Sequence, residues 1–205
     1  MTLDEALDLC PIVAILRGVR PDEVLAHGEA LLTAGVRVVE TPLNSPDPFA
    51  SVARLAEAFA KTMFVGAGTV LTPDQAAATA SAGGRLTVSP NTDPRVIRAA
   101  LAHGLEAAPG FATASEAFVA LEAGARRLKL FPAASYGPGH LRQLRAVLPP
   151  EVSFWAVGGV GPDDLAAWRA AGAAAFGIGG ELYRPGQAPA DTLAKARRLV
   201  EALRG

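Results

Sequence analysis

Apolar runs and amphipathic segments alternate along the whole chain. A helical pattern repeatedly ends in a glycine and is followed at once by an apolar run, as in LLTAGVRVVE, TASAGGRLTV, ALAHGLEAAP, LEAGARRLKL and RAAGAAAFGI. Glycine tolerates the left-handed conformation that ends many helices, so each phrase predicts a helix-to-strand junction. The opposite junctions carry the Pro, Asp, Ser and Thr residues typical of helix N-termini, in RPDE, SPDPF, TPDQ, TDPRV, TASEA and GPDDL.

These junctions delimit eight predicted strands, each followed by a helix, with a short helix before the first. The strands cover residues 12–18, 36–43, 63–70, 85–91, 105–111, 127–133, 153–160 and 173–180. Nearly continuous apolar strands that alternate with amphipathic helices indicate a parallel sheet covered by helices. Eight units of roughly 26 residues predict an α/β fold of the (β/α)8 TIM-barrel class with a short N-terminal helix. An open doubly wound sheet is the alternative, which the even spacing and the absence of GxGxxG after the first strand disfavour.

Composition narrows the classes of partner. With 205 residues that are 50% hydrophobic, residues 1–205 can form one barrel domain around a sizeable core. Nineteen basic and twenty acidic residues give a net charge of -1, which argues against a nucleic-acid surface and favours a small uncharged or anionic partner. Cys10 has no second cysteine to pair with, the first ten residues lack the basic start of a signal peptide, and no apolar run approaches the ~20 residues of a membrane span. We expect a cytoplasmic protein without a membrane partner.

Barrels of this class carry their chemistry at the carboxyl ends of the strands. The predicted strand ends present Arg17, Glu40, Thr69, Pro90 with Asn91, Lys129, the pair Gly158–Gly159 and the pair Gly179–Gly180. Counting by two along each strand places Arg17 on the face of Ile15, Glu40 on that of Val38, Thr69 on that of Ala67, and Lys129 on that of Phe131. If that face is the barrel interior, the cations and the carboxylate converge.

Lys129 stands in the apolar run Leu128–Phe131, although lysine is rarely buried without a partner. A strand lysine is usually a solvated edge residue, but a closed parallel barrel has no edge and its strands are covered by helices. Burial disfavours the charged amine and lowers its pKa, and a neutral amine can attack a ketone to form a Schiff base. The positive charge of a nearby Arg17 would also lower the pKa of Lys129.

Glu40 ends a Val-Val run, where a carboxylate without a partner would be costly. Two interpretations are open: a structural ion pair with Lys129 or Arg17, or general acid/base work during carbon–carbon cleavage. Both interpretations place Glu40 beside Lys129.

The glycine pairs after strands seven and eight occupy the position at which these barrels commonly bind phosphate with main-chain N–H groups. They predict a phosphorylated substrate. By contrast, His27, His103 and His140 fall in or beside helices, on the presumed outside, without metal-ligand spacing, so we expect no catalytic metal. Arg127 alternates inward with Lys129 and is expected in solvent at the opposite mouth of the barrel.

The segments PIVAILRG, VETPLNSP, VGAGTVL, VSPN, LKLFPA and VGGV occur in this order between residues 10 and 185. In this order they resemble the signatures of the class I 2-keto-3-deoxy-6-phosphosugar-acid aldolases, the KDPG/KHG aldolase family. The resemblance implies a homotrimeric (β/α)8 barrel without metal or cofactor that cleaves its substrate to pyruvate and glyceraldehyde 3-phosphate. It further implies that Lys129 is the Schiff-base lysine and Glu40 the general acid/base. The expected substrate-binding residues are Arg17, Thr69 and Pro90 around the pyruvyl group, and Gly158, Gly159, Gly179 and Gly180 around the phosphate.

Two departures from the family pattern bear on the substrate. After the glutamate, the gluconate-type branch usually reads Val-Thr-Leu-Arg-Thr, whereas this chain has Thr41–Ser45 with Asn44 in place of the arginine, which resembles the galactonate branch. Gly180 replaces a frequent serine, which removes one possible hydroxyl contact to phosphate. We therefore expect 2-dehydro-3-deoxy-6-phosphogalactonate as the substrate. The alternatives are 2-dehydro-3-deoxy-6-phosphogluconate, 4-hydroxy-2-oxoglutarate, and a non-catalytic barrel that binds a phosphorylated ligand.

Overall fold

The computed structural model describes residues 1–204, in which all strands of one sheet run parallel. The strands are β1 (Ile12–Ile15), β2 (Val38–Pro42), β3 (Phe64–Gly68), β4 (Leu86–Val88), β5 (Glu106–Ala108), β6 (Gly110–Phe111), β7 (Arg127–Leu130), β8 (Ser153–Val157) and β9 (Ala175–Ile178). They are ordered β5-β4-β3-β2-β1-β9-β8-β7-β6.

Two of these short strands, β5 and β6, together make the fifth predicted strand. They are separated by Pro109, which has no N–H to donate to a sheet. β5 pairs with β4, β6 pairs with β7, and the Lys129 N–H donates to the Pro109 carbonyl oxygen at 2.9 Å. The segment thus joins the two edges of the sheet, and the predicted (β/α)8 barrel is confirmed.

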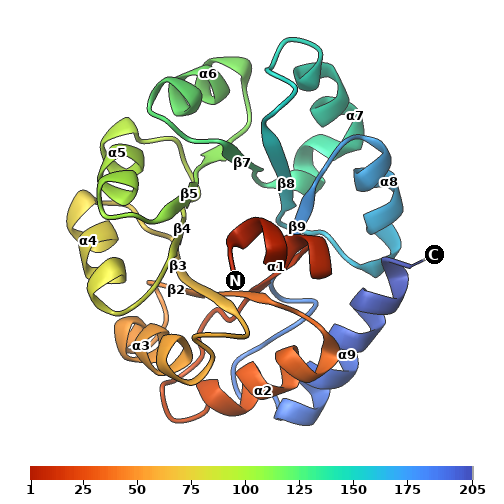
Figure 1. The fold of residues 1–205 in the computed structure, drawn as a ribbon. Coiled ribbons are helices and arrows are strands. Elements are labelled where there is room, and N and C mark those ends of the chain that lie inside the picture. The colour runs from red at the N-terminus through yellow and green to blue at the C-terminus, as the bar shows by residue number, and fades with distance from the viewer. Residues whose placement is uncertain (205) are drawn as a thin grey trace.

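Helices surround this barrel as a ring (Figure 1). The ring helices are α2 (Val24–Ala34), α3 (Pro48–Ala58), α4 (Pro73–Ser81), α5 (Pro94–Ala102), α6 (Ala114–Glu122), α7 (Ala133–Arg145), α8 (Leu165–Ala170) and α9 (Pro189–Ala202), with a 3-10 turn η1 (Pro162–Asp164) before α8. A further helix, α1 (Leu3–Leu9), precedes β1 and lies inside the ring. Thr72, Asp93 and Thr113 cap α4, α5 and α6 with side-chain oxygens, as the polar junctions predict. The predicted helix-ending glycines have φ between 72° and 104°, at Gly35, Gly83, Gly104, Gly124 and Gly172.

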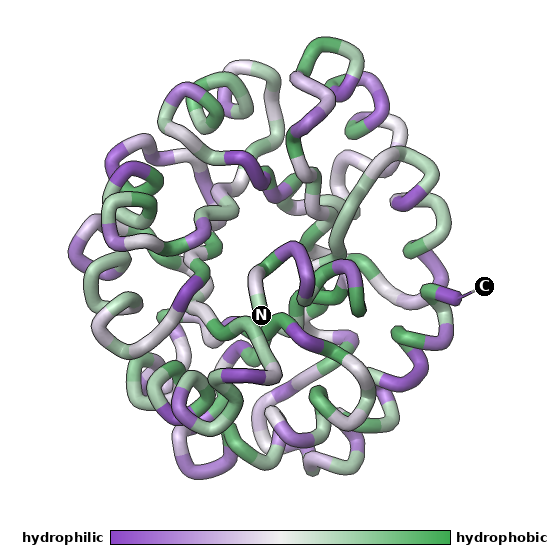
Figure 2. Tube along the Cα trace, viewed as in Figure 1, coloured by the Kyte–Doolittle hydropathy of each residue, from purple (hydrophilic) through white to green (hydrophobic). Residues whose placement is uncertain are grey.

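The hydrophobic core has two layers. One layer fills the space between the strands and the helices, and hydrophobic and hydrophilic stretches alternate around that ring as expected for amphipathic helices (Figure 2). The second layer fills the barrel interior with large side chains that include Val38, Phe64, Leu86 and Trp155. None of the described helices has the length and apolar content needed to cross a bilayer.

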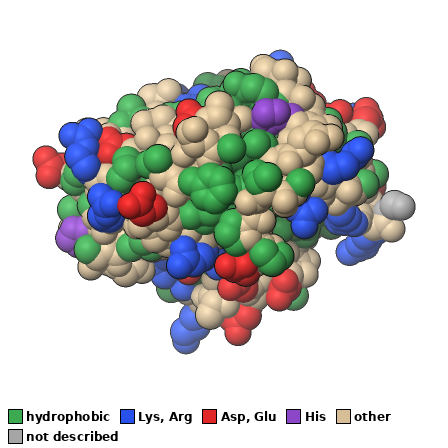
Figure 3. All heavy atoms as spheres, turned by 90° about the horizontal axis from the view of Figure 1, so that it is seen from above, with side chains coloured by type: hydrophobic (Ala, Val, Ile, Leu, Met, Phe, Trp, Pro, Cys, Tyr) green, Lys and Arg blue, Asp and Glu red, His purple; other side chains and the backbone are tan. Residues whose placement is uncertain are grey.

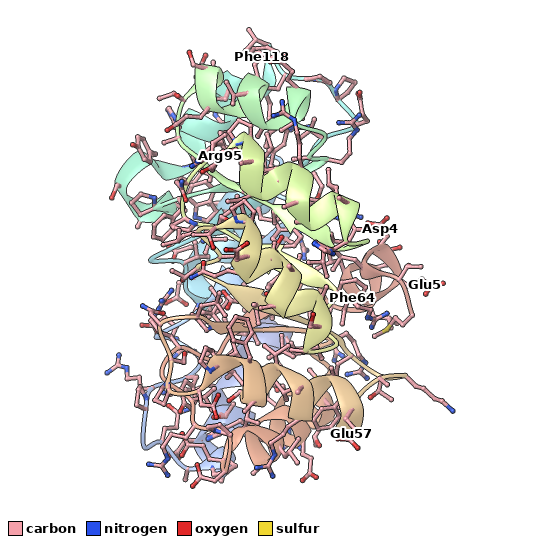
Figure 4. All side chains as sticks on the ribbon, turned by 90° about the vertical axis from the view of Figure 1, so that its left-hand side faces the viewer. Asp4, Glu5, Glu57, Phe64, Arg95 and Phe118 are labelled. Carbon is pink, nitrogen blue, oxygen red and sulfur yellow. The ribbon has the colours of Figure 1, made fainter. Side chains whose placement is uncertain are left out.

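Helix α1 lies across the amino-terminal end of the barrel (Figure 1), where Leu3 and Ala6 join the interior layer. Figure 4 shows Asp4 and Glu5 of α1 at the end where Phe64 begins β3, away from the end at which α5 starts near Arg95. Arg127 reaches this end, as expected, but it is not in solvent. Its Nη1 donates to Glu106 Oε2 at 2.6 Å and its Nη2 to Asp4 Oδ1 at 2.7 Å, and the side chain is 12% exposed.

Candidate active site

Lys129 is buried in the barrel near its carboxyl-terminal end. It stands on strand β7, and the residue is 6% exposed. Its Nζ lies 4.5 Å from the centroid of the Phe131 ring. The pKa of the Lys129 amine is lowered to about 8, chiefly by burial; Glu40 opposes this shift and Arg17 adds to it. The amine is therefore available in its neutral form close to neutral pH.

Glu40 reaches the same interior from β2. The residue is 2% exposed, and its buried Oε2 has no hydrogen-bond partner within residues 1–204. Burial raises the pKa of the Glu40 carboxyl to about 7, against the opposing effects of Lys129 and Arg17. The carboxylate leans over β3 at Gly68, where any side chain would collide with it. In the described part of the chain no salt bridge joins Glu40 to Lys129 or Arg17, so the structure does not support the interpretation of Glu40 as a structural ion-pair partner.

Arg17 extends from the end of β1 and is held by two neighbouring loops. Its Nη1 donates to Asn44 Oδ1 at 2.6 Å and to Thr69 Oγ1 at 3.4 Å. The next residues are joined as well, because the Gly18 N–H donates to Ser45 Oγ at 2.8 Å. Asn44 thus contacts the guanidinium directly, a contact that strand alternation does not predict.

Thr69 reaches Arg17 as predicted, but its predicted place on the same face as Ala67 is wrong. Ala67 belongs to the layer between strands and helices, and Gly68 faces inward against Glu40, so regular alternation would point Thr69 away from the barrel interior. Thr69 instead has φ of 56°, a left-handed conformation that breaks the alternation. This local turn brings its hydroxyl to Arg17.

A cavity of about 440 Å³ opens at this end of the barrel. Eight of the predicted site residues line it: Arg17, Thr69, Pro90, Lys129, Gly158, Gly159, Gly179 and Gly180. The lining omits Glu40, which is buried, and Asn44, which lies against Arg17. It also includes residues that the sequence analysis missed, namely Ile15, Phe131, Val157 and Gly177. Counting by two from the buried Trp155 could have found Val157.

The glycine pairs form the rim of this cavity. Gly158 and Gly159 have φ of 94° and 72°, which favour glycine over other residues. Within residues 1–204 no main-chain hydrogen bond uses the N–H groups of Gly158, Gly159, Gly179 or Gly180. Free N–H groups at adjacent strand ends can bind the oxygens of a phosphate.

The histidines lie outside this cavity. His27 is wrongly predicted on the outside, because the structure buries it at 1% exposure between α2 and its neighbours. Among residues 1–204 no cluster of three or more His, Cys, Asp or Glu side chains has a metal-binding arrangement.

Comparison with known proteins places this chain in a family. Residues 3–198 match the family described as "Aldolase: KDPG and KHG aldolase". The chain is 48% identical to the 2-dehydro-3-deoxy-6-phosphogalactonate aldolase of Escherichia coli K12, over 95% of both chains. It is 44% identical to a probable aldolase of the same name from Rhizobium meliloti 1021, over 94% of this chain and 91% of the relative. A solved structure described as "Native KDPGal structure" superposes with a TM-score of 0.93 at 48% identity, over 95% of this chain and 94% of the other. The chain therefore belongs to the KDPG and KHG aldolase family.

Proposed function

We propose that this protein is a Schiff-base aldolase that cleaves 2-dehydro-3-deoxy-6-phosphogalactonate to pyruvate and D-glyceraldehyde 3-phosphate. The observation that carries the proposal is the buried Lys129, whose lowered pKa makes a neutral nucleophile beside a cavity. The names of the two similar proteins support the choice of substrate.

The reaction begins at Lys129. Its neutral Nζ attacks the C2 ketone, the resulting carbinolamine loses water, and an iminium ion forms that can accept the electron pair of the C3–C4 bond. Phe131 packs against the amine and keeps the site apolar. Arg17 offers further N–H donors beyond the one engaged by Asn44 and Thr69, and these suit the substrate carboxylate.

Glu40 moves the protons. With a pKa near 7, its carboxyl can take the proton of the C4 hydroxyl, directly or through water, as the C3–C4 bond breaks. Glyceraldehyde 3-phosphate leaves, and the electron pair remains on the pyruvyl enamine. Protonation of the enamine at C3 and addition of water to the iminium release pyruvate and restore Lys129. The Oε2 of Glu40 forms no hydrogen bond among the described residues, so the carboxylate keeps an unused acceptor, which supports this role.

The substrate phosphate binds at the rim in this proposal. The N–H groups of Gly158, Gly159, Gly179 and Gly180 supply donors, and the proposed reaction requires no metal or cofactor. Other substrates remain as alternatives: 2-dehydro-3-deoxy-6-phosphogluconate, which differs in configuration at C4, and 4-hydroxy-2-oxoglutarate.

Pyruvate with borohydride tests the function. Reduction should add one pyruvyl-derived mass at Lys129, and turnover of the galactonate-derived substrate should exceed that of the gluconate-derived one. A protein that binds phosphate but traps no pyruvate would be a non-catalytic barrel.

We also infer that residues 1–205 act as a single domain in a homotrimer. The side that carries α6 and α7 shows hydrophobic side chains gathered at its centre (Figure 3). The exposed apolar side chains of these helices include Phe118 at 49%, Val119 at 40% and Tyr136 at 44%. Exposed apolar patches of this kind are typical of subunit contacts. The charged substrate does not cross a bilayer unaided, which favours a cytoplasmic location.

A further inference from the structure

A buried polar network lies behind the glycine rim, outside the residues assigned to the reaction. It connects α2, α9 and the segment between β9 and α9, residues 179–188, which begins with the pair Gly179–Gly180. Buried polar side chains are costly unless hydrogen bonds satisfy them, so a network of this kind fixes the elements that it joins.

The network starts at the turn that follows β9. Main-chain N–H groups of Leu182 and Tyr183 donate to the Gly179 carbonyl oxygen at 2.8 and 2.9 Å. Arg184 Nε donates to the Gly180 carbonyl oxygen at 3.2 Å. A carbonyl group shares its peptide plane with the N–H group of the next residue, so these contacts orient the N–H groups of Gly180 and Glu181. Their orientation therefore depends on where residues 182–184 lie.

Tyr183 ties this turn to α2. Its ring is buried, and its hydroxyl donates to Glu23 Oε1 at 2.9 Å at the start of α2. The same ring meets the His27 ring edge-on, with 4.8 Å between the centroids. Pro185 packs against the end of β1, because a Cβ on Gly18 would lie 2.7 Å from Pro185 Cγ. The turn is therefore held beside Arg17 as well.

Gln187 and Thr192 make a second connection to the same helix. Gln187 Nε2 donates to the Leu182 carbonyl oxygen at 2.8 Å and to Thr192 Oγ1 at 2.7 Å, while its Oε1 accepts from Lys195 Nζ at 2.6 Å. Thr192 Oγ1 is 2.9 Å from His27 Nδ1, and both residues are almost fully buried. Burial lowers the pKa of His27, so the ring stays neutral at the end of this chain of hydrogen bonds.

We propose that Tyr183, Gln187, Thr192 and His27 are positioning residues that hold the peptide between Gly179 and Gly180 in the orientation in which the Gly180 N–H binds the substrate phosphate. The inference rests on the proposed function, since it assumes that these glycines receive a phosphate. The network touches neither Lys129 nor Glu40, so it acts on phosphate affinity and leaves the Schiff-base chemistry intact.

Two conservative variants test this role. Tyr183→Phe removes the hydroxyl bond to Glu23 but keeps the ring against His27, and Thr192→Val removes two hydrogen bonds at nearly constant volume. Tyr136→Phe is the matched control, because it removes a tyrosine hydroxyl outside the network and the cavity lining and keeps the apolar ring. Thr192→Ser restores the hydroxyl and should restore wild-type behaviour.

The measurements compare a phosphorylated 2-keto-3-deoxy sugar acid with its unphosphorylated counterpart, together with inhibition by inorganic phosphate and the Tm. For Tyr183→Phe and Thr192→Val we expect KM for the phosphorylated substrate and the inhibition constant of phosphate to rise about threefold to tenfold, the effect of one or two misaligned donors. Their kcat, and their turnover of the unphosphorylated substrate, should stay within about twofold of wild type.

Equal losses on both substrates would assign the network a purely structural role and overturn the proposal, as would unchanged phosphate affinity in both variants. A wild-type protein that neither prefers the phosphorylated substrate nor responds to inorganic phosphate would overturn the phosphate site itself and the positioning role with it. Pyruvate trapping at Lys129 in the same samples shows whether the aldolase function stands independently.

Discussion

Strand β7 carries two inward cations, Arg127 and Lys129, that face opposite ends of the same barrel. At the amino-terminal end both terminal nitrogens of Arg127 are paired, with Glu106 and with Asp4. At the carboxyl-terminal end Lys129 is also enclosed but forms no salt bridge in the described chain. One positive charge is satisfied by its neighbours, and the other is left with a lowered pKa.

The contrast shows how an enclosed charge becomes reactive or inert. The carboxylates of Glu106 and Asp4 pair with the Arg127 guanidinium, and the contact with Asp4 ties α1 to the barrel, which is a structural role. Burial without such partners shifts the pKa of Lys129 and of Glu40 toward neutrality, which is typical of functional groups. Each of the following experiments alters one side of this contrast.

Loss of Lys129, the cation without a salt bridge, should have the largest effect on activity. Lys129→Ala should abolish trapping of pyruvate by borohydride and lower the cleavage rate about 10³-fold or more, because the nucleophile is gone. Mass spectrometry locates the adduct, and Arg127→Met serves as the control that should still trap. An adduct at Lys61 or Lys195 would contradict the assignment of Lys129.

Removing the carboxylate should have the next largest effect. Glu40→Gln should reduce kcat about 10²-fold to 10³-fold, since proton transfer at the C4 hydroxyl is lost. The negative charge of Glu40 raises the pKa of Lys129, so its removal lowers that pKa further and should move the rise of trapping with pH to lower pH.

Arg17→Leu should shift the pH dependence of pyruvate trapping in the opposite direction. The positive charge of Arg17 lowers the pKa of Lys129, so its loss should move the same rise to higher pH. Trapping rates measured between pH 5 and about 9 decide this, and shifts in the same direction for both variants would contradict the electrostatic account.

A variant of Asn44 tests whether the open end of the barrel selects between the two C4 epimers of the substrate. We expect kcat/KM to favour the galactonate-derived epimer, and Asn44→Arg to reduce that preference on the order of tenfold, because a cation replaces the amide beside Arg17. Steady-state kinetics with both C4 epimers measure the ratio. Equal losses for the two epimers would mean that Asn44 only supports Arg17.

Loss of Arg127, the paired cation, should lower the stability of the protein and change the cleavage rate little. Arg127→Met should lower the free energy of unfolding by about 2 kcal/mol, which corresponds to a Tm lower by about 4–8 °C in a protein of this size. Most of the loss is assigned to the enclosed contact with Glu106, because the Asp4 side chain is 75% exposed. Thermal unfolding together with kcat checks this, and a loss of rate larger than the loss of stability would break the contrast.

Removal of metals should have the smallest effect. Exhaustive EDTA treatment should leave kcat unchanged, because the proposed iminium already provides the electron sink that a metal would supply. A loss of activity that a divalent cation restores would point to a metal-stabilised enolate.

Local sequence pattern was sufficient for the barrel and for the enclosure of Lys129 and Glu40. Both stand in apolar strands, and two-residue alternation inside a closed barrel leaves them few other places to point. The helix-to-strand junctions were predictable from glycines for a similar reason, because a helix-ending glycine acts locally, through the backbone conformation of a few residues.

Features that depend on long-range or unusual geometry were not predictable in this way. Thr69 reaches Arg17 only through a left-handed backbone that alternation does not foresee. His27 and Thr192 meet across 165 positions of sequence, so a helical pattern alone suggested that His27 faced outward. Pro109 divides one strand in two, although its carbonyl still completes the ladder with β7.

The helix across the amino-terminal end also bears on the order in which products depart. With α1 closing one opening, the cavity at the other end serves as both entrance and exit. In the proposed reaction the phosphorylated fragment lies at the rim and the pyruvyl fragment deeper, bonded to Lys129. The aldehyde must then leave first and pyruvate last. In such a sequential release, pyruvate competes with substrate for the free enzyme, whereas glyceraldehyde 3-phosphate does not.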